Sequence, residues 1–319
     1  MASVSHLRKL LDAILGDDRK YTSTSKFVDG TLLSVFSTLT LGQPFEVWKT
    51  RMGRHRGEST VRAFRTILAT GGVRSFWAGT GPKVVESATK GGVLLVVKEC
   101  IQKQLKAWGA SPTVAGFLSG AGGGVAQTIV MAPCTFLVTA QVLGSPKSSL
   151  MSVIQNTYAS KGLLGFYAGS SAVAARQASN WASRVGFTEA VRSQIASVRY
   201  GSPTARLSIT EECWAGIIGG VLSCWNHPFE VARIEMQART LASETPMGML
   251  EVLRHVHRGH GLQGLFQGLL PRMGTNVWLT LAMVSGANIV QQLREGSERS
   301  ARKGAQLANT LSGAALQRG

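Results

Sequence analysis

The stretch PFEVWK at positions 44–49 decides the fold, because related stretches recur twice further along the chain. They are PCTFLV at positions 133–138 and PFEVAR at positions 228–233. The three prolines lie 89 and 95 residues apart. A pattern that returns at nearly constant spacing indicates internal repeats of about 90 residues.

A second motif, in which glycine closely follows aromatic residues, comes 35, 36 and 40 residues after the three prolines. Its copies are FWAG at 76–79, FYAG at 166–169 and LFQG at 265–268. Two motifs that recur three times in the same order strengthen the assignment of three repeats. The alternative of a soluble α-solenoid is disfavoured, because solenoid repeats run to roughly 20–50 residues.

Each repeat is predicted to contain two long helices with a short amphipathic helix between them. The long helices that carry the prolines span about 26–53, 112–142 and 208–240. The short helices span about 61–70, 150–159 and 247–257, and the second long helices about 81–106, 170–197 and 269–293. Because each long helix exceeds the ~20 residues that cross a bilayer, the sequence predicts six transmembrane helices.

Composition agrees with a membrane protein that is rich in small residues. Charged residues make up 16% of the chain, against roughly 25% in an average soluble protein. The chain contains 37 glycines, a residue that is more frequent in transmembrane helices than in soluble ones. The four cysteines show no metal-ligand spacing, so we expect no metal site. The formal net charge of +17 favours anionic partners.

An acid and a base follow two of the prolines and stand three residues apart, as Glu46 with Lys49 and Glu230 with Arg233. This spacing places both groups on one helix face. Ionisable groups at membrane depth are costly unless they are paired or functional. If three such helices converge, the acid of one pairs with the base of the next and closes a gate. The alternative is a plain ion pair within each helix.

The stretches 44–49 and 228–233 resemble the P-x-[DE]-x-x-[KR] signature of mitochondrial carriers, and the resemblance covers about residues 26–293. It implies an all-α membrane protein of the mitochondrial inner membrane, with six transmembrane helices in three pseudo-symmetric repeats and three short matrix helices around a central cavity. It also implies alternating access, a monomer, a gate on the matrix side and cardiolipin as a structural lipid, without another cofactor. The predicted segments are 1–25 (N-terminal extension), 26–108, 109–200 and 201–294 (repeats), and 295–319 (disordered tail).

The second copy of the signature departs from the family pattern, because Thr135 replaces the acid and Val138 replaces the base. Glu46 would then face Val138, Thr135 would face Arg233, and Glu230 with Lys49 would remain the single full pair of a weak gate. A glutamine, Gln237, resembles the brace found beneath such pairs. The predicted gate residues are Pro44, Glu46, Lys49, Pro133, Thr135, Pro228, Glu230, Arg233 and Gln237. We find no clean copy of the motif that closes the opposite side.

Substrates in this family bind midway along the second long helix of each repeat, about two turns after the aromatic-glycine motif. The residues at those places are Glu86, Lys90, Leu94, Arg176, Gln177, Arg272, Thr275 and Asn276, with Lys83 and Arg184 as further candidates. Three bases and one acid suit a di- or tricarboxylate, since arginine binds carboxylates in bidentate fashion. As alternatives, Glu86 only neutralises Lys90, and the two arginines only bond helix carbonyls.

Within the family, Glu86, Lys90 and Leu94 at four-residue spacing, followed by Arg176-Gln177 and by Arg272, are similar to the yeast-type citrate–oxoglutarate carriers. This similarity implies an antiporter that exchanges citrate for 2-oxoglutarate. Two alternatives remain: a carrier of another anion such as a nucleotide, with Trp181 as the stacking residue, and a basic membrane protein associated with mitochondrial DNA. No nucleophile–base arrangement suggests an enzyme. His227 either faces the cavity floor or is structural.

Overall fold

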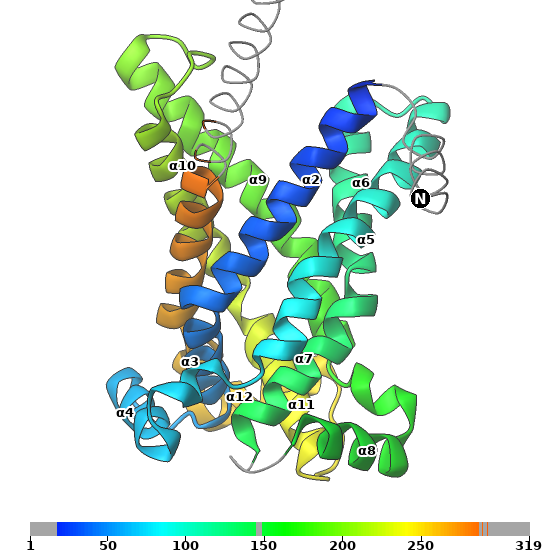
Figure 1. Cartoon of the computed structure of the whole chain (residues 1–319), viewed down its shortest axis with the longest axis vertical. Helices are drawn as coiled ribbons and strands as arrows, with labels where there is room; N and C mark the ends of the chain where they lie inside the picture. The colour runs from blue at the N-terminus through cyan, green and yellow to red at the C-terminus, as the bar shows by residue number, and fades with distance from the viewer. Residues whose placement is uncertain (1–17, 145–148, 287–288, 290–291, 293–319) are drawn as a thin grey trace, which may run out of the picture.

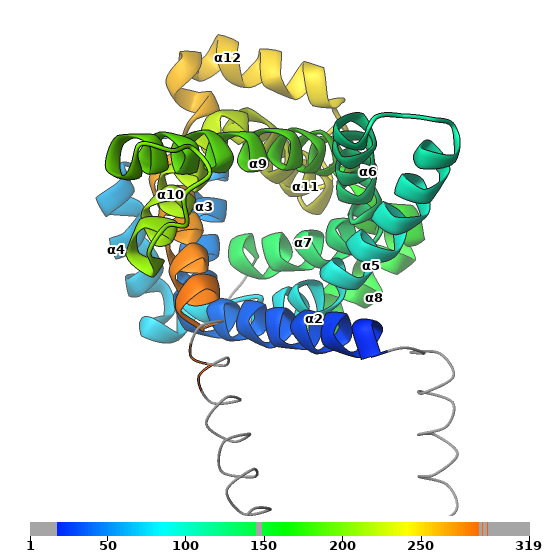
Figure 2. The same cartoon turned by 90° about the horizontal axis from the view of Figure 1, so that it is seen from above.

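The computed structural model describes residues 18–144 and 149–286, together with residues 289 and 292. Every regular element in this part of the chain is a helix (Figure 1). Seen from above, the helices of the three repeats form a ring around a common axis (Figure 2). The predicted tail 295–319 and most of the predicted extension 1–25 lie outside the described residues.

The three repeats contain matching elements in the same order. The first has α2 (Asp18–Ser37), the π-helical turn η1 (Thr38–Gly42), α3 (Gln43–Arg54), α4 (Thr60–Gly71), η2 (Val73–Trp77) and α5 (Thr80–Ala107). The second has α6 (Pro112–Ala126), α7 (Thr128–Leu143), α8 (Leu150–Lys161), η3 (Leu163–Tyr167) and α9 (Ser170–Tyr200). The third has α10 (Ile209–Leu222), η4 (Ser223–Asn226), α11 (His227–Leu241), α12 (Met249–Leu265) and a last helix over residues 269–286.

The proline-bearing helices, each predicted as one long helix over 26–53, 112–142 and 208–240, are each divided by a break. Proline lacks an N–H donor and its ring crowds the preceding turn, which favours a break on its N-terminal side. In the first repeat Thr40 leaves the helical region (φ −85°, ψ −109°), four residues before Pro44. In the second repeat the break falls at Gln127, and Pro133 stays inside α7.

Among the described residues, no single helix is both long enough and apolar enough for a membrane span. Length and apolar composition are sufficient in one bent pair, Val114–Ala126 with Thr128–Leu143, whose two parts meet at 43°. The polar residues that lower the hydropathy of the other long helices include those that face the central cavity described below.

The glycine of each aromatic-glycine motif packs against the signature helix of the next repeat. Gly79, Gly169 and Gly268 have φ values of +76°, +76° and +86°, a region that other residues rarely adopt. A Cβ atom on these glycines would approach the following atoms: Val138 Cα at 3.0 Å from Gly79, Arg233 O at 3.2 Å from Gly169, and Lys49 O at 3.1 Å from Gly268. Because the third repeat contacts the first in the same way, these contacts close the ring.

In the first and third repeats, the side chain directly before the proline forms a hydrogen bond from the helix break to the aromatic-glycine motif of the same repeat. The Nε2 atom of Gln43 donates to Ala78 O at 2.5 Å, and Nε2 of His227 donates to Gln267 O at 2.9 Å. The His227 ring is fully buried and stacks on Phe266 with 6.4 Å between ring centroids. Of the two roles that the sequence left open for His227, the structure shows the structural one.

The short helices α4, α8 and α12 lie at one end of the ring, outside the ends of α3, α7 and α11 (Figure 1). Serine side chains cap two of them. Ser59 Oγ accepts a hydrogen bond from the backbone N of Arg62 at 3.3 Å, and Ser149 Oγ accepts from the backbone N of Ser152 at 3.1 Å. These caps satisfy amide groups that a helix start leaves without partners.

Replacing Gly268 with alanine tests the ring closure. We expect Gly268→Ala to lower the free energy of unfolding by about 1–3 kcal/mol, because φ is positive and the new Cβ meets Lys49 O. Thermal unfolding of the purified protein in detergent measures this loss. Gly81→Ala is the control, since Gly81 is exposed on α5 with no atom within 4 Å of a new Cβ. Equal melting temperatures for the two variants would contradict the packing argument.

Candidate substrate cavity and gate

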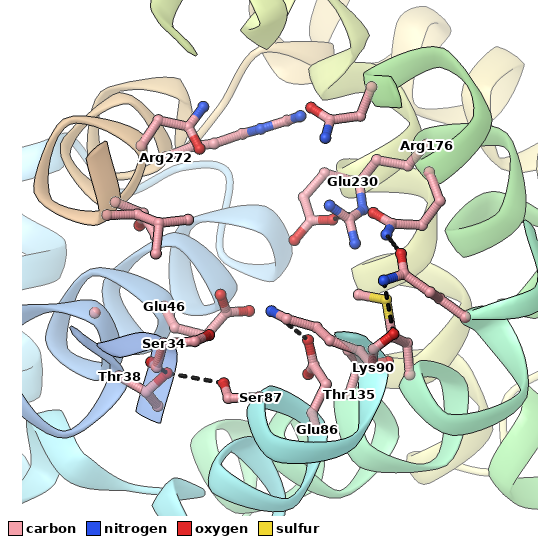
Figure 3. Close-up of a pocket in the computed structure, with 18 of the residues that line it drawn as sticks. Ser34, Thr38, Glu46, Glu86, Ser87, Lys90, Thr135, Arg176, Glu230 and Arg272 are labelled. Carbon is pink, nitrogen blue, oxygen red and sulfur yellow. Dashed lines mark hydrogen bonds and ion pairs between the residues drawn. The ribbon is translucent and has the colours of Figure 1, made fainter. Parts of the chain in front are cut away.

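A cavity of about 510 Å³ lies between the three repeats, and Figure 3 shows the side chains around it. Most of the residues that the sequence predicts for the substrate site and the gate line this cavity. The predicted residues in its wall are Glu46, Lys49, Lys83, Glu86, Lys90, Thr135, Arg176, Gln177, Glu230, Arg233, Arg272, Thr275 and Asn276. The side chain of Arg184 is outside the described part of the structure.

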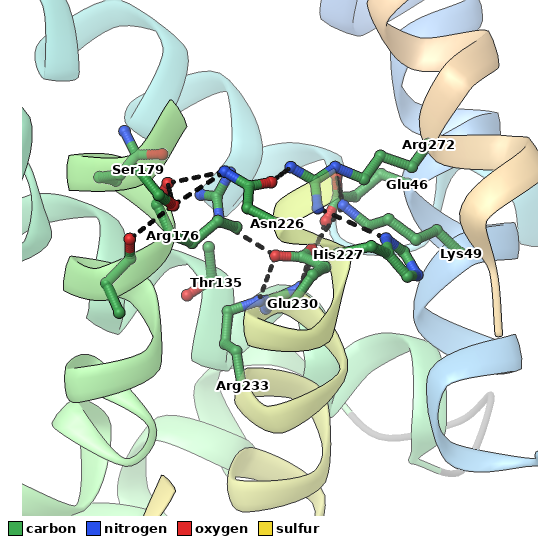
Figure 4. A network of polar contacts seen from close by, with 12 residues as sticks. Glu46, Lys49, Thr135, Arg176, Ser179, Asn226, His227, Glu230, Arg233 and Arg272 are labelled. Atoms are coloured by element: carbon green, nitrogen blue, oxygen red, sulfur yellow. Dashed lines mark hydrogen bonds and ion pairs between the residues drawn. The ribbon is translucent and has the colours of Figure 1, made fainter. Parts of the chain in front are cut away.

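At the base of the cavity the Glu230 carboxylate, 2% exposed, lies between three cations (Figure 4). Its Oε1 atom is 2.7 Å from Lys49 Nζ and 2.8 Å from Arg233 Nη2, and its Oε2 atom is 3.1 Å from Arg176 Nε. These cations come from all three repeats. Because an unpaired buried charge costs several kcal/mol, the cluster holds the ends of α3, α9 and α11 together.

The second acid of the gate, Glu46, also contacts several cations. Its carboxylate oxygens lie 2.8 Å from Lys49 Nζ, 3.6 Å from Arg233 Nη2 and 3.6 Å from Lys83 Nζ. The structure therefore contains the predicted pair of Glu230 with Lys49, but the prediction that it would be the single full pair was wrong. With no base at Val138, Glu46 turns to the Arg233 guanidinium, which lies between the two carboxylates.

The signature helix of the second repeat, α7, carries no charged side chain and is joined to this network by Gln237. The Oε1 atom of Gln237 accepts from Arg233 Nη1 at 2.9 Å and from Thr139 Oγ1 at 2.7 Å, and its Nε2 atom donates to Thr135 Oγ1 at 3.1 Å. Thr135 thus faces Gln237 rather than Arg233, contrary to the sequence interpretation. Val138 packs on Gly79 and does not face Glu46. Hydrogen bonds hold α7 where ion pairs hold the other two helices.

A second ionic cluster, which the sequence reasoning missed, lies at the ends of α3 and α11. Glu235 is 2% exposed and contacts Arg54 at 2.7 Å, Arg56 at 2.9 Å and Arg239 at 3.2 Å. The available signal was the run of bases Arg51, Arg54 and Arg56 at the end of the first signature helix, which needs an acidic partner. The cluster adds a further connection between the first and third repeats.

The loop after α3 is fixed to the third repeat. Arg51 donates two hydrogen bonds to the Glu58 carboxylate, at 2.7 and 2.9 Å, and these bonds lower the pKa of Glu58. Gln267 Nε2 donates to the backbone oxygen of Glu58 at 2.8 Å. The loop therefore bears an ionised carboxylate at neutral pH, outside the buried network.

On the first-repeat wall, the closest base to the Glu86 carboxylate is Lys83, which the sequence offers only as a further candidate. Lys83 Nζ lies 3.0 Å from Glu86 Oε2, whereas Lys90 Nζ lies 3.8 Å from Glu86 Oε1. Lys83 follows Gly79 by four residues, as Arg272 follows Gly268, and this correspondence was the signal for its place in the cavity.

Leu94 is not in the cavity wall, contrary to the prediction. Its Cδ1 atom would lie 3.0 Å from a Cβ at Gly123, so the side chain packs against α6. The physical reason is that α5 lies against α6 at this height, so the apolar side chain is buried between the two helices.

The second-repeat and third-repeat walls are fixed by amide side chains that the sequence analysis missed. Gln127 Oε1 accepts from Gln177 Nε2 at 2.8 Å, and Gln127 Nε2 donates to Lys90 O at 2.9 Å. The guanidinium of Arg272 donates to Asn226 Oδ1 and lies 3.4 Å from His227 Nδ1. Gln127 and Asn226 both stand shortly before a signature proline, and this position was the available signal in the sequence.

Other predicted residues have mainly structural contacts. Asn276 Nδ2 donates to Gly220 O at 2.9 Å. The ring of Trp181 packs on Gly124, where a Cβ would come within 2.5 Å of Trp181 Cδ1, and its Nε1 atom lies 3.4 Å from Gln127 Oε1. A tryptophan held in this way offers less of its face for stacking on a nucleotide base.

At the opposite end of the cavity, Arg192 joins α9 to α10. It lies 3.1 Å from Glu189 and also pairs with Glu212. Glu189 and Thr188 line the upper part of the cavity.

Three repeats, each with a broken signature helix, surround a central cavity with one buried ionic network beneath it, and this arrangement is that of a transporter of the mitochondrial carrier type. Comparison with known families shows the same: the sequence pattern of the mitochondrial carrier protein family matches residues 19–107, 109–198 and 205–296. The chain belongs to this family, whose members are transporters and not enzymes.

Among individual proteins, the chain is 32% identical over 288 residues to the citrate/oxoglutarate carrier protein of Saccharomyces cerevisiae. The alignment covers 86% of this chain and 91% of that protein. It is 25% identical to the mitochondrial 2-oxodicarboxylate carrier of Mus musculus, over 73% of this chain and 82% of that protein. It is 24% identical to the mitochondrial glycine transporter A of Danio rerio, over 79% of this chain and 89% of that protein.

Substitution of Gln237 tests how α7, the signature helix of the second repeat, is held in place. We expect Gln237→Met to lower the free energy of unfolding by about 2–3 kcal/mol, because Arg233, Thr139 and Thr135 lose a buried partner. Thermal or chemical unfolding in detergent measures the loss. Gln267→Met is the matched control, since that side chain is only partly buried and makes a single described bond, to Glu58 O. A loss for Gln237→Met no larger than for the control would show that α7 does not depend on this brace.

Proposed function

We propose that this protein is an antiporter of the mitochondrial inner membrane that exchanges di- and tricarboxylates, citrate for 2-oxoglutarate, by alternating access. The family assignment supports transport across this membrane, and the similarity to a citrate/oxoglutarate carrier supports the substrates. The chemistry of the cavity supports an anion of low molecular mass.

The observation that carries the proposal is the Arg272 guanidinium, which is 6% exposed in the cavity wall and contacts neutral side chains. Its hydrogen-bond partners in the described structure are Asn226 and His227, and no carboxylate of the described residues lies within ion-pair distance. A buried charge without a counter-ion is costly. An incoming carboxylate supplies that counter-ion, and guanidinium binds it in bidentate fashion.

The charge balance of the whole cavity agrees with this substrate class. Six bases and four acids line it: Lys49, Lys83, Lys90, Arg176, Arg233 and Arg272 against Glu46, Glu86, Glu189 and Glu230. The excess of two positive charges suits a dianion or a trianion and opposes a cation. A volume of about 510 Å³ falls within the roughly 300–1,000 Å³ of small-molecule sites.

The outer surface is compatible with a bilayer. Large apolar side chains are exposed on the outside of the ring, among them Phe36 (55%), Ile129 (64%), Trp225 (53%) and Leu270 (60%). Extended exposure of this kind marks membrane or partner contact. In the proposed arrangement the six long helices cross the membrane as a monomer, with cardiolipin as a structural lipid at the ends of α4, α8 and α12. The breaks in the proline-bearing helices are tolerated because they line a cavity within the protein.

Substrate binding and the gate share one residue. Arg176 lines the cavity and also lies 3.1 Å from Glu230 at the gate. A substrate carboxylate that binds Arg176 withdraws it from Glu230 and weakens the closed network. Since a ligand shifts a conformational equilibrium by its differential affinity, this competition offsets part of the cost of opening the gate.

The proposal is tested with purified protein in liposomes loaded with 2-oxoglutarate, by measuring uptake of labelled citrate. We expect exchange with citrate and 2-oxoglutarate, and none with glycine or ATP. Arg272→Ala should reduce citrate exchange by about 10- to 100-fold, the effect of losing one charge-assisted contact of roughly 1.5–3 kcal/mol.

Arg199→Ala is the matched control, because Arg199 is 68% exposed and pairs with Glu211 near the far end of α9. It should retain the exchange rate of the unmodified protein. Folded protein that exchanges no carboxylate, or that exchanges glycine or ATP instead, would overturn the proposed substrates and leave the family assignment intact.

A further inference from the structure

The Asn226 side chain connects two cavity arginines that belong to different repeats. It is 1% exposed and stands at the end of η4, directly before His227 and Pro228. Its Nδ2 atom donates to Arg176 O at 3.2 Å and to Ser179 Oγ at 3.0 Å, and its Oδ1 atom accepts from Arg272 Nη2 (Figure 4). One amide therefore fixes the backbone beside one arginine and the guanidinium of the other.

Gln127 makes the same pattern of contacts in the second repeat. Its Nε2 atom donates to Lys90 O on α5, and its Oε1 atom accepts from the Gln177 side chain on α9. In both cases the amide stands at the break of a signature helix. It donates to the backbone of the preceding repeat and accepts from a side chain of its own repeat.

The two arrangements are related by a shift of one helical turn. Gln127 precedes its proline by six residues and Asn226 precedes its proline by two. Lys90 and Arg176 follow their motif glycines by eleven and seven residues, and Gln177 and Arg272 by eight and four. Every position thus moves by four residues, which is about one turn of an α-helix. A coherent shift in three elements indicates a built arrangement, not two unrelated contacts.

We propose that Asn226, with Gln127 as its counterpart, is a positioning residue for substrate binding: it holds the Arg272 guanidinium and the Arg176 segment in place without neutralising either charge. This inference rests on the proposed carboxylate exchange. A neutral acceptor is required for this role, because an aspartate at the same position would satisfy the guanidinium and remove its attraction for a substrate.

The position of Asn226 also connects substrate binding to the helix break. The residue lies between η4 and α11, so a rotation of α11 about this break moves the amide away from one or both arginines. Opening of the gate below thereby changes the geometry of the site that binds the carboxylate groups.

The test measures KM and maximal rate for citrate and for 2-oxoglutarate in liposomes. Asn226→Asp is nearly isosteric and loses the hydrogen bond to Arg176 O, but its new ion pair with Arg272 offsets this loss, so we expect a melting temperature close to that of the unmodified protein. Its KM should rise at least about tenfold, and more for the tricarboxylate than for the dicarboxylate, because the added charge opposes the more highly charged substrate more strongly. Asn226→Ala should raise KM for both substrates by similar factors.

Gln43→Ala is the matched control, since it removes another buried amide at a helix break, one that donates to Ala78 O and does not line the cavity. It should lower the melting temperature and leave both KM values unchanged. Gln127→Glu provides a second test of the charge effect, with the same direction of change in KM, and decides the matter if Asn226→Asp does not fold.

The positioning role would be overturned if Asn226→Asp, or Gln127→Glu in its place, left both KM values unchanged and lowered only the maximal rate or the melting temperature. The proposed function would then still stand. Absence of carboxylate exchange by the unmodified protein would overturn the proposed function, and this inference with it.

Discussion

The buried Glu230 carboxylate is the constraint on which the rest of the structure depends. A carboxylate that is 2% exposed must have cationic partners, and those partners come from all three repeats as Lys49, Arg176 and Arg233. The helix breaks bring these groups together at one level. The motif glycines then allow the neighbouring backbones to approach closely enough for the ring to close.

The ring is closed unequally. Between the first and third repeats the structure has two layers of ion pairs, one around Glu230 and Glu46 and one around Glu235. In the second repeat, α9 contributes Arg176 to the cluster around Glu230, whereas α7 is attached through the Gln237 amide. Hydrogen bonds between neutral groups contribute less than those to charged groups.

Much of the fold could be predicted from sequence, because it depends on patterns that repeat. The repeats, the order of helices and the places of Arg176, Gln177 and Arg272 follow from motif spacing. The distance of each helix break from its proline was not predicted, because spacing shows where a proline lies and not how far the helix before it unwinds. Gln127 and Asn226 were missed for the same reason.

Other misses concern partners across the ring. The contact of Arg233 with Glu46 depends on which direction a long side chain takes when its expected partner is replaced. The burial of Leu94 against Gly123 depends on how closely α5 and α6 pack, which a single helix does not reveal. Both are properties of tertiary packing, and neither is encoded in the periodicity of one segment.

A buried ion pair between the first and third repeats, Lys49 with Glu230, closes the ring. A double-mutant cycle on these two residues tests this most directly, with Lys49→Met, Glu230→Gln and the double variant compared in thermal unfolding. We expect a coupling free energy of at least about 1 kcal/mol, since directly contacting residues are non-additive by roughly 0.5–3 kcal/mol. Strictly additive losses would contradict it, because the two side chains would then stabilise the ring independently.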